Sequence, residues 1–418
     1  MKRIRTIWIA TFALCASISA HAEIAWPPEL PANVLGTDGA LIVDANLYID
    51  LSKAPTGAWN AAGNGSGIFD PDKWAVVFKF SSVKIARFNS LSFKNHPSGA
   101  PVVWLVSGDV EVSGTLDVSG TGSSPGPGGF RGGQAATTSV SASDGFGIGG
   151  GMALHADGCY VSTTGNSCGT SGYGNNILVP LVGGSGGRGS ATIIGGYVGG
   201  GGGGALLIVA TGKVTINGLV DASGVSASGG GGGGGGVRIV TGALEGAGTI
   251  SASAGSAATG TTVDKQQIGR VRLEFPQGGA ARWTGTVEPQ TIADVPSNPV
   301  LLWPSPQDPT VNIVSVNQVA VPGAAVLQAN LSQPDLPPLP AGTTQLVVRL
   351  KTTNVSVADA AQRGKVRVRY TPARGNDSLF VDATLEGGSL SSADWTATIP
   401  MKHDIVVLQA IAENPKPQ

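Results

Sequence analysis

Residues 195–242 read GGYVGGGGGGALLIVATGKVTINGLVDASGVSASGGGGGGGGVRIVTG and hold two polyglycine tracts, residues 199–204 and 229–236. Each tract comes directly before an apolar run, ALLIV or VRIV, that is typical of a β-strand. Glycine loses more conformational freedom on folding than any other residue, so such tracts are unfavourable unless the fold requires them. The requirement follows from the way this stretch repeats along the chain.

Alignment of the chain with itself shows three copies of one unit. SGDVEVSGTLDVSG, which begins at Ser107, matches TGKVTINGLVDASG at an offset of 104 residues, and TGALEGAGTISASAG matches it again 30 residues further along. The glycines that hold equivalent turn positions in the three copies are Gly108 and Gly114, Gly212 and Gly218, and Gly242 and Gly248.

Each unit predicts a short strand, a glycine turn and a second short strand with apolar residues at alternate positions. Strands this short become stable when equivalent strands stack above and below them and bury a continuous aliphatic column. The repeat therefore predicts a parallel β-helix, of either hand, with the glycine tracts projecting from one corner.

Because the two tracts are 30 residues apart, we expect them to leave the same edge and lie beside each other. They could pair through main-chain hydrogen bonds in an extended form related to polyproline II, or remain solvated loops. Residues 121–197 are a glycine-rich insertion that we expect to fold against the helix, with Phe130, Phe146 and Tyr160 as anchors. Insertions often carry the working face of a solenoid.

The fold class expected for the whole chain is all-β, a parallel β-helix with glycine-rich insertions followed by a small β-sandwich. The ranges are 1–22 for a secretory signal peptide, 23–75 for an N-terminal capping region, 76–290 for the β-helix, 291–310 for a proline-rich linker and 311–418 for an immunoglobulin-like sandwich. The signal peptide predicts export, to the cell surface, the medium or the periplasm. No membrane span is expected in the chain that remains after the signal peptide is removed.

Cys159 and Cys168 form a close pair that, in an exported chain, predicts a local disulfide. No cluster of histidine and cysteine accompanies them, so neither a metal nor another cofactor is expected. The net charge of −1, with 13% charged residues, argues against a nucleic-acid partner.

The segments PVVWLVSGDVEVSGTLDVSG, PGGFRGG, GGGGGGALLIVATGKVTINGLVDASG and GRVRLE together resemble secreted glycine-rich bacterial proteins of uncharacterised function. The resemblance implies export and a β-helical fold. The later DPTVNIVSVNQVAVP and VRVRYTP are similar to the immunoglobulin-like domain that follows such regions. No catalytic residue is implied by these structural motifs.

Asp117 and Asp221 occupy equivalent positions in two copies and would be the catalytic carboxylates if the protein were an enzyme acting on polysaccharide. The third copy has Ser251 there, and an Asp before a small residue and Gly commonly shapes a turn, which we favour. The arginines near the glycine-rich stretches are expected to cap exposed carbonyl groups; they are Arg131, Arg188, Arg238, Arg270 and Arg272.

The sequence therefore favours a non-enzymatic structural or adhesion-type surface protein over a polysaccharide hydrolase or lyase. A lectin-like or ice-like binding face is a third hypothesis. Under any of these hypotheses, the expected partner of the protein is a surface polysaccharide or another envelope protein, and the sequence does not distinguish between them.

Overall fold

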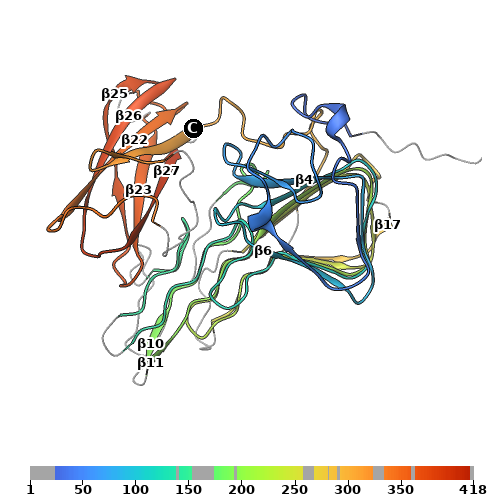
Figure 1. The fold of residues 1–418 in the computed structure, drawn as a ribbon, viewed down its shortest axis with the longest axis horizontal. Helices are drawn as coiled ribbons and strands as arrows, with labels where there is room; N and C mark the ends of the chain where they lie inside the picture. Colours follow the sequence, from blue (N-terminus) through green and yellow to red (C-terminus); the bar gives the residue numbers. More distant parts are fainter. Residues whose placement is uncertain are drawn as a thin grey trace, which may run out of the picture.

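The computed structural model describes residues 24–137, 141–152, 174–192, 195–257, 268–280, 282–289, 292–322, 334–358 and 363–414. The expected all-β class is confirmed: the described elements are β-strands apart from two single 3₁₀ turns, η1 (Ala32–Val34) and η2 (Leu51–Lys53). Figure 1 shows a parallel-stranded body, an array of extended segments below it, and a separate group of antiparallel strands that ends the chain.

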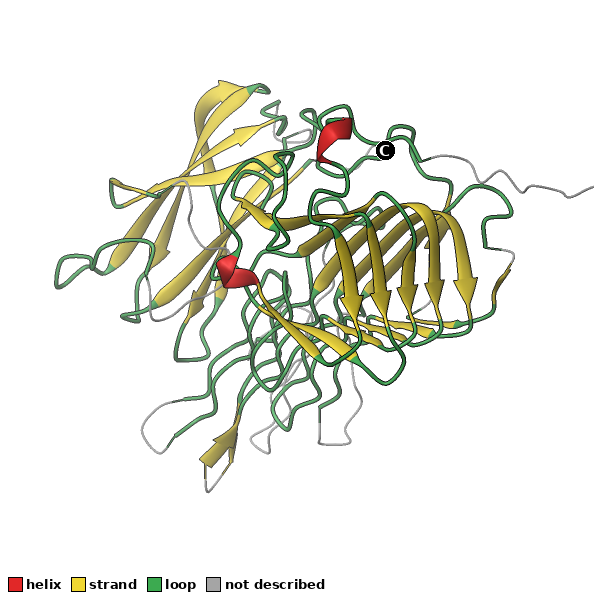
Figure 2. Cartoon of the chain, turned by 45° about the vertical axis from the view of Figure 1, so that its right-hand side comes forward, coloured by secondary structure: helices red, strands yellow, loops and turns green. Residues whose placement is uncertain are grey.

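A large sheet forms one side of the body and curls around it (Figure 2). Neighbouring strands in it are parallel except where β3 meets β4. Its strands are β1 (Ala40–Val43), β3 (Ile68–Asp70), β4 (Ala75–Phe80), β5 (Ser82–Ile85), β7 (Val102–Val106), β8 (Val110–Val112), β12 (Ala205–Ile216), β14 (Gly236–Gly246), β16 (Arg270–Glu274), β17 (Arg282–Trp283) and β19 (Ile292–Asp294).

A small parallel sheet forms another side, and the chain passes repeatedly from the large sheet to the small one. Its strands are β2 (Leu47–Asp50), β6 (Ser90–Lys94), β9 (Thr115–Asp117), β13 (Leu219–Asp221), β15 (Thr249–Ser251) and β18 (Thr286–Glu288).

The pairing register confirms the alignment of the three copies. Val214 of β12 pairs with Val110 on one side and Leu244 on the other, and all three side chains are fully buried. Equivalent apolar residues of the small sheet pair in the same way and complete the shared core. Full burial of each such side chain contributes about 1.5–3 kcal/mol, so this column is the main stabilising feature of the body.

Glycines form a matching column at the turn between the two sheets. A Cβ on Gly218 would lie 1.8 Å from the carbonyl oxygen of Gly114, and one on Gly248 would lie 2.3 Å from that of Gly218. No side chain fits at such separations, so these turns require glycine for close backbone approach. Gly212 and Gly242 lie within strands β12 and β14, and a Cβ on Gly212 would lie 2.1 Å from the carboxylate of Asp109.

The two polyglycine tracts lie side by side, as expected from their spacing. The amides of Gly200 and Gly203 donate to the carbonyl oxygens of Gly230 and Gly233, at 2.8 and 2.9 Å. Donors three residues apart and the absence of positive φ in either tract fit an extended three-fold backbone of the polyproline II type. Solvated loops are therefore not what the structure shows.

The insertion joins the same array from the other side. Gly184 and Gly187 donate to the carbonyl oxygens of Gly203 and Gly200, both at 2.8 Å. We call residues 122–133, 143–151, 183–189, 199–204 and 229–236 the glycine array; Figure 1 shows them as parallel wavy segments below the body. A Cβ on Gly202 would lie 1.9 Å from the carbonyl oxygen of Gly184, so no side chain fits between these two segments.

The outer face of the large sheet is covered by the two segments that flank it in sequence. Ile24 and Leu30 from the beginning of the described chain, with Val300 and Leu302 from the proline-rich segment, bury themselves against this face. The stretch predicted as a linker thus adheres to the sheet, and Trp303 stacks edge-on against Trp59 at 5.4 Å.

The chain ends in two antiparallel sheets that share one core, called here the C-terminal pair of sheets. One holds β20 (Thr310–Val316), β21 (Val319–Ala320), β22 (Gln345–Thr353), β25 (Thr384–Ser389) and β26 (Ser392–Pro400). The other holds β23 (Lys365–Pro372), β24 (Leu379–Asp382) and β27 (Val406–Glu413).

Candidate functional site

The two aspartates singled out from the sequence are brought together. Asp221 pairs in register with Asp117 on neighbouring strands of the small sheet, and the position continues as Ser251 and Glu288. Adjacent strands lie about 4.8 Å apart, so the two carboxylates share one column on the outer face.

Each of these carboxylates is held by its own turn. Asp117 accepts a hydrogen bond from the amide of Ser119 at 2.8 Å, and Asp221 accepts one from Ser223 at 2.9 Å. This is the side-chain-to-backbone bond of an Asx turn. The column is continued by hydroxyl groups, with Ser223 and Ser251 2.8 Å apart. The arrangement stabilises stacked turns, as the turn interpretation predicts.

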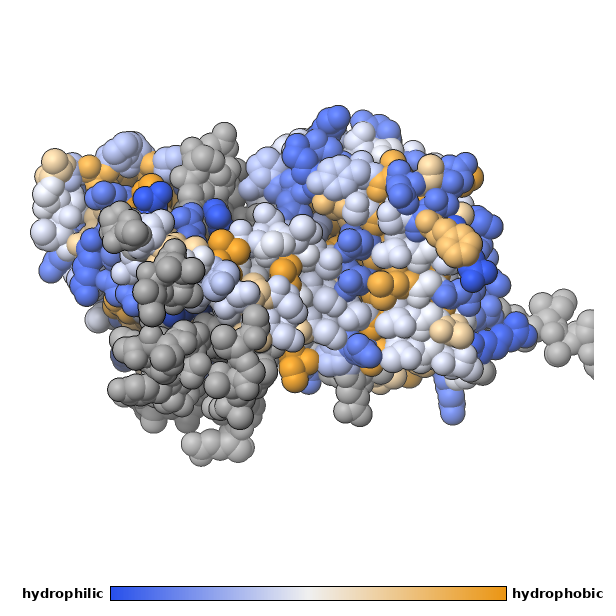
Figure 3. Space-filling model, turned by 90° about the horizontal axis from the view of Figure 1, so that it is seen from below, coloured by the Kyte–Doolittle hydropathy of each residue, from blue (hydrophilic) through white to orange (hydrophobic). Residues whose placement is uncertain are grey.

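Figure 3 shows the underside of the molecule, with hydrophilic residues toward both ends and a pale zone between them. Hydrophobic residues form only small separate groups on this face. Within the small sheet, Thr115, Leu219, Thr249 and Thr286 follow one another in register. Leu219 interrupts the column, so the uniform threonine array that an ice-like face needs does not form.

Buried arginines hold the segments around the body in place. Arg238 and Arg272, paired in register, both donate to the carboxylate of Glu274 at 2.7 Å. Arg238 also donates to the carbonyl oxygen of Leu301 at 2.7 Å, which is the capping role expected of it. Burial opposes the charge of Arg272, but Glu274 and Asp294 outweigh it and raise the pKa of its guanidinium.

The insertion meets the C-terminal pair of sheets through a second buried group. Arg369, fully buried on β23, donates to the carbonyl oxygens of Gly145 at 3.0 Å and Gly150 at 3.2 Å, and also to that of Gly147. Nearby, Arg188 pairs with the fully buried Asp144 at 3.2 Å. Sequence reasoning missed Arg369; the only hint was an arginine at an alternate position of the strand-like VRVRYTP.

The anchors expected for the insertion are partly confirmed. Phe130 and Phe146 are 4% and 1% exposed, and the guanidinium of Arg131 lies 5.9 Å from the Phe146 ring centre. Tyr160 lies outside the described residues. So do Cys159 and Cys168, and their disulfide stays a prediction.

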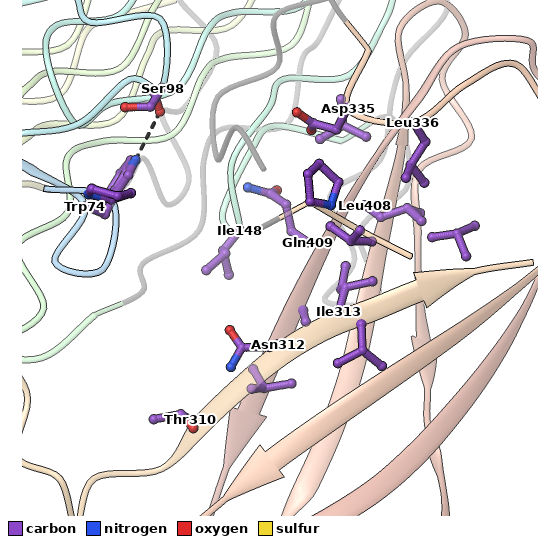
Figure 4. Close-up of a pocket in the computed structure, with 18 of the residues that line it drawn as sticks. Trp74, Ser98, Ile148, Thr310, Asn312, Ile313, Asp335, Leu336, Leu408 and Gln409 are labelled. Atoms are coloured by element: carbon purple, nitrogen blue, oxygen red, sulfur yellow. Dashed lines mark hydrogen bonds between the residues drawn. The ribbon is translucent and has the colours of Figure 1, made fainter. Parts of the chain in front are cut away.

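A large cleft of about 1240 Å³ lies between the body and the C-terminal pair of sheets (Figure 4). Trp74 faces it from the body, where its indole N–H donates to the carbonyl oxygen of Ser98 at 3.0 Å. Ile148 comes from the insertion, while β20 and β27 supply the opposite wall. Neither Asp117 nor Asp221 lines this cleft. Its walls come from distant parts of the chain, so no sequence pattern indicates it.

Two polar atoms of the cleft wall are buried without a hydrogen-bond partner in the structure. They are the indole nitrogen of Trp303 and the side-chain oxygen of Gln409. Gln409 as a whole is 7% exposed. A buried polar atom with no partner is unfavourable by about 1–3 kcal/mol, so these two atoms are a local cost to the stability of the wall.

Among the residues that the structure describes, no group of three or more histidine, cysteine, aspartate or glutamate side chains could hold a metal ion. Neither of the two short helical turns in the described chain is long and apolar enough to span a membrane. Comparisons with protein-family models, with curated proteins and with solved structures gave no match.

Proposed function

We propose that the chain is an exported, non-enzymatic structural or adhesion-type surface protein, built on a parallel β-helix and ending in an immunoglobulin-like sandwich. The observation that carries the proposal is the in-register stacking of the repeat. Val110, Val214 and Leu244 pair across neighbouring strands, while the chain passes alternately between the two parallel sheets. Such stacking buries a continuous core and leaves long, regular outer faces available for contact.

The glycine array supports a mechanical role. Its segments are joined by main-chain hydrogen bonds and approach too closely for side chains, which makes a thin, ordered plate beside the body. Most of its positions are glycines with no room for a side chain, so we assign the plate a role in shape and stiffness.

The enzyme hypothesis is disfavoured by the setting of its two carboxylates. Asp117 and Asp221 each accept the amide of their own turn, and they lie outside the large cleft. A glycoside hydrolase needs one carboxyl to act as an acid and the other as a base or nucleophile around a bound sugar.

The proposal is tested by locating the protein and assaying it in parallel. Full-length tagged protein should be found in the medium, at the surface or in the periplasm, and purified mature protein should bind a polysaccharide or envelope fraction without releasing reducing ends or unsaturated products. Release that disappears in both Asp117→Asn and Asp221→Asn variants would establish the hydrolase or lyase alternative. Retention in the cytoplasm would contradict export.

A further inference from the structure

The edges of two strands, β20 and β27, form part of the wall of the large cleft. Consecutive residues 406–410 of β27 all line it, as do residues 310–314 of β20. Side chains of a strand point alternately to opposite faces, so a cleft that touches every residue runs along the strand's edge. The cleft therefore runs along two sheet edges, one from each member of the C-terminal pair of sheets, and separates them from the body.

Both edges lack a neighbouring strand in the described chain. β27 pairs only with β23, and β20 pairs with β22 along its length. On the other side of β20, β21 pairs with Ser315 and Val316, and the amide of Val321 donates to the carbonyl oxygen of Val314 at 3.1 Å. Alternate residues within 310–313 and 406–410 thus direct unpaired main-chain groups toward the cleft, the situation in which an extended chain adds to a sheet.

The direction of the free groups on β27 follows from its ladder. The amide of Ala373 donates to the carbonyl oxygen of Ile405, its direct partner in the register, at 2.9 Å. Because hydrogen-bonded pairs alternate in an antiparallel ladder, the main-chain groups of Leu408, Ala410 and Ala412 point away from β23. Leu408 and Ala410 line the cleft, so their unpaired main-chain groups face it.

The side chains around the cleft define the chemistry of an occupant. Its inner wall is aliphatic, with Ile313, Leu346 and Leu408 among its residues, and its rim is acidic. The charged residues of the lining are Asp72, Lys73, Asp335 and Asp404. At about 1240 Å³ the cleft exceeds the usual 300–1,000 Å³ of a small-molecule pocket, which favours a chain-like ligand.

We propose that this cleft accepts an extended segment of another protein as an added β-strand, with alternating apolar residues facing the aliphatic wall and basic residues at the acidic rim. The main-chain groups of Leu408 and Ala410 pair with the incoming strand. This inference goes beyond the scaffold function and does not depend on it.

The test uses the mature full-length protein and a synthetic peptide of alternating valine and threonine with a lysine at each end. Calorimetric titration should show saturable binding. Ala410→Pro, which removes one amide from the free edge, should weaken binding by about tenfold or more. Ala412→Pro is the matched control, because its amide has the same direction on the same strand but lies beyond the cleft lining, and it should change the affinity by less than about twofold.

A peptide N-methylated at every valine and threonine separates strand addition from apolar adsorption, because it keeps the side chains and loses the amide donors on both edges. It should bind at least about tenfold more weakly. The proposal is overturned if no saturable binding occurs, if both proline variants bind alike, or if N-methylation has no effect. Dimerisation of the protein alone that Ala410→Pro abolishes would assign the edge to a second copy and overturn the choice of a foreign partner.

Discussion

The amide of Lys213 donates a hydrogen bond to the carboxylate of Asp109 at 2.9 Å, although 104 residues separate them in sequence. The same offset relates Val214 to Val110 and Asp221 to Asp117 in the strand register. An insertion of glycine-rich chain has therefore been placed between two adjacent layers without disturbing how they stack. Such tolerance is expected where an insertion leaves and returns at one corner.

The glycine column at the turn should be intolerant of any side chain. Gly218→Ala places a methyl group 1.8 Å from the carbonyl oxygen of Gly114, so we expect a loss of about 3 kcal/mol in the free energy of unfolding, measured with urea. Gly387→Ala is the control, because no atom lies within 4 Å of its Cβ position, and its effect should stay within about 0.5 kcal/mol. Equal effects of the two changes would contradict the close approach.

The glycine array should behave as ordered structure in solution. The amides of Gly200 and Gly203, which donate to Gly230 and Gly233, should exchange with deuterium far more slowly than the same residues in a short peptide. Exchange at peptide-like rates would show that the array opens freely and would remove the support it gives to a mechanical role.

Arg369 should be essential for the attachment of the C-terminal pair of sheets. Arg369→Met retains much of the volume but leaves the carbonyl oxygens of Gly145 and Gly150 without their charged donor, so we expect a loss of at least about 3 kcal/mol. Calorimetry should resolve separate unfolding transitions in this variant. The exposed Arg349 offers the control Arg349→Met, which should leave the melting profile unchanged.

Acid should weaken the N-terminal part of the body through His96. Its ring stacks on Phe69 with centroids 4.0 Å apart, and burial lowers the pKa of the imidazole below its usual 6.5. The unfolded chain then binds more protons than the folded one as the pH falls through 6.5, so stability is lost in this window and the loss is complete below the folded pKa.

The variant His96→Phe keeps an aromatic ring against Phe69 and cannot titrate. Its free energy of unfolding should fall less steeply between about pH 6.5 and 5 than that of the unmodified protein. Parallel slopes for the two proteins would show that other groups govern the acid response.

The stacking of the body could be predicted because the sequence patterns that determine it are local and are repeated along the chain. Alternating apolar residues and turn glycines recur at fixed offsets, and one-residue errors of register would expose the whole column at Val110 and Val214. The proximity of the two tracts followed from their spacing in the same way. Because equivalent positions of the copies pair with each other, contacts between residues far apart in the chain can be predicted from the sequence.

The large cleft and the docking of the C-terminal pair of sheets could not be predicted in this way. Arg369 and Gly145 belong to segments that share no periodicity, and their contact depends on how two separately formed units come together. The adherence of Val300 and Leu302 was likewise hidden, since five prolines nearby indicated a stiff spacer. Asp117 and Asp221 were placed correctly as equivalent positions, and each forms the turn hydrogen bond that the sequence favoured.

The insertion between the first two copies also has a consequence for the order of folding. β12 pairs with β14 across 30 residues and with β8 across 104, in the same register. The closure entropy of a flexible loop grows with the logarithm of its length, so the longer closure is less favourable by about 1 kcal/mol before any contact compensates for it. Strands β12 and β14 are thus expected to pair before β12 joins β8, so the first copy of the repeat meets a pair that has already formed.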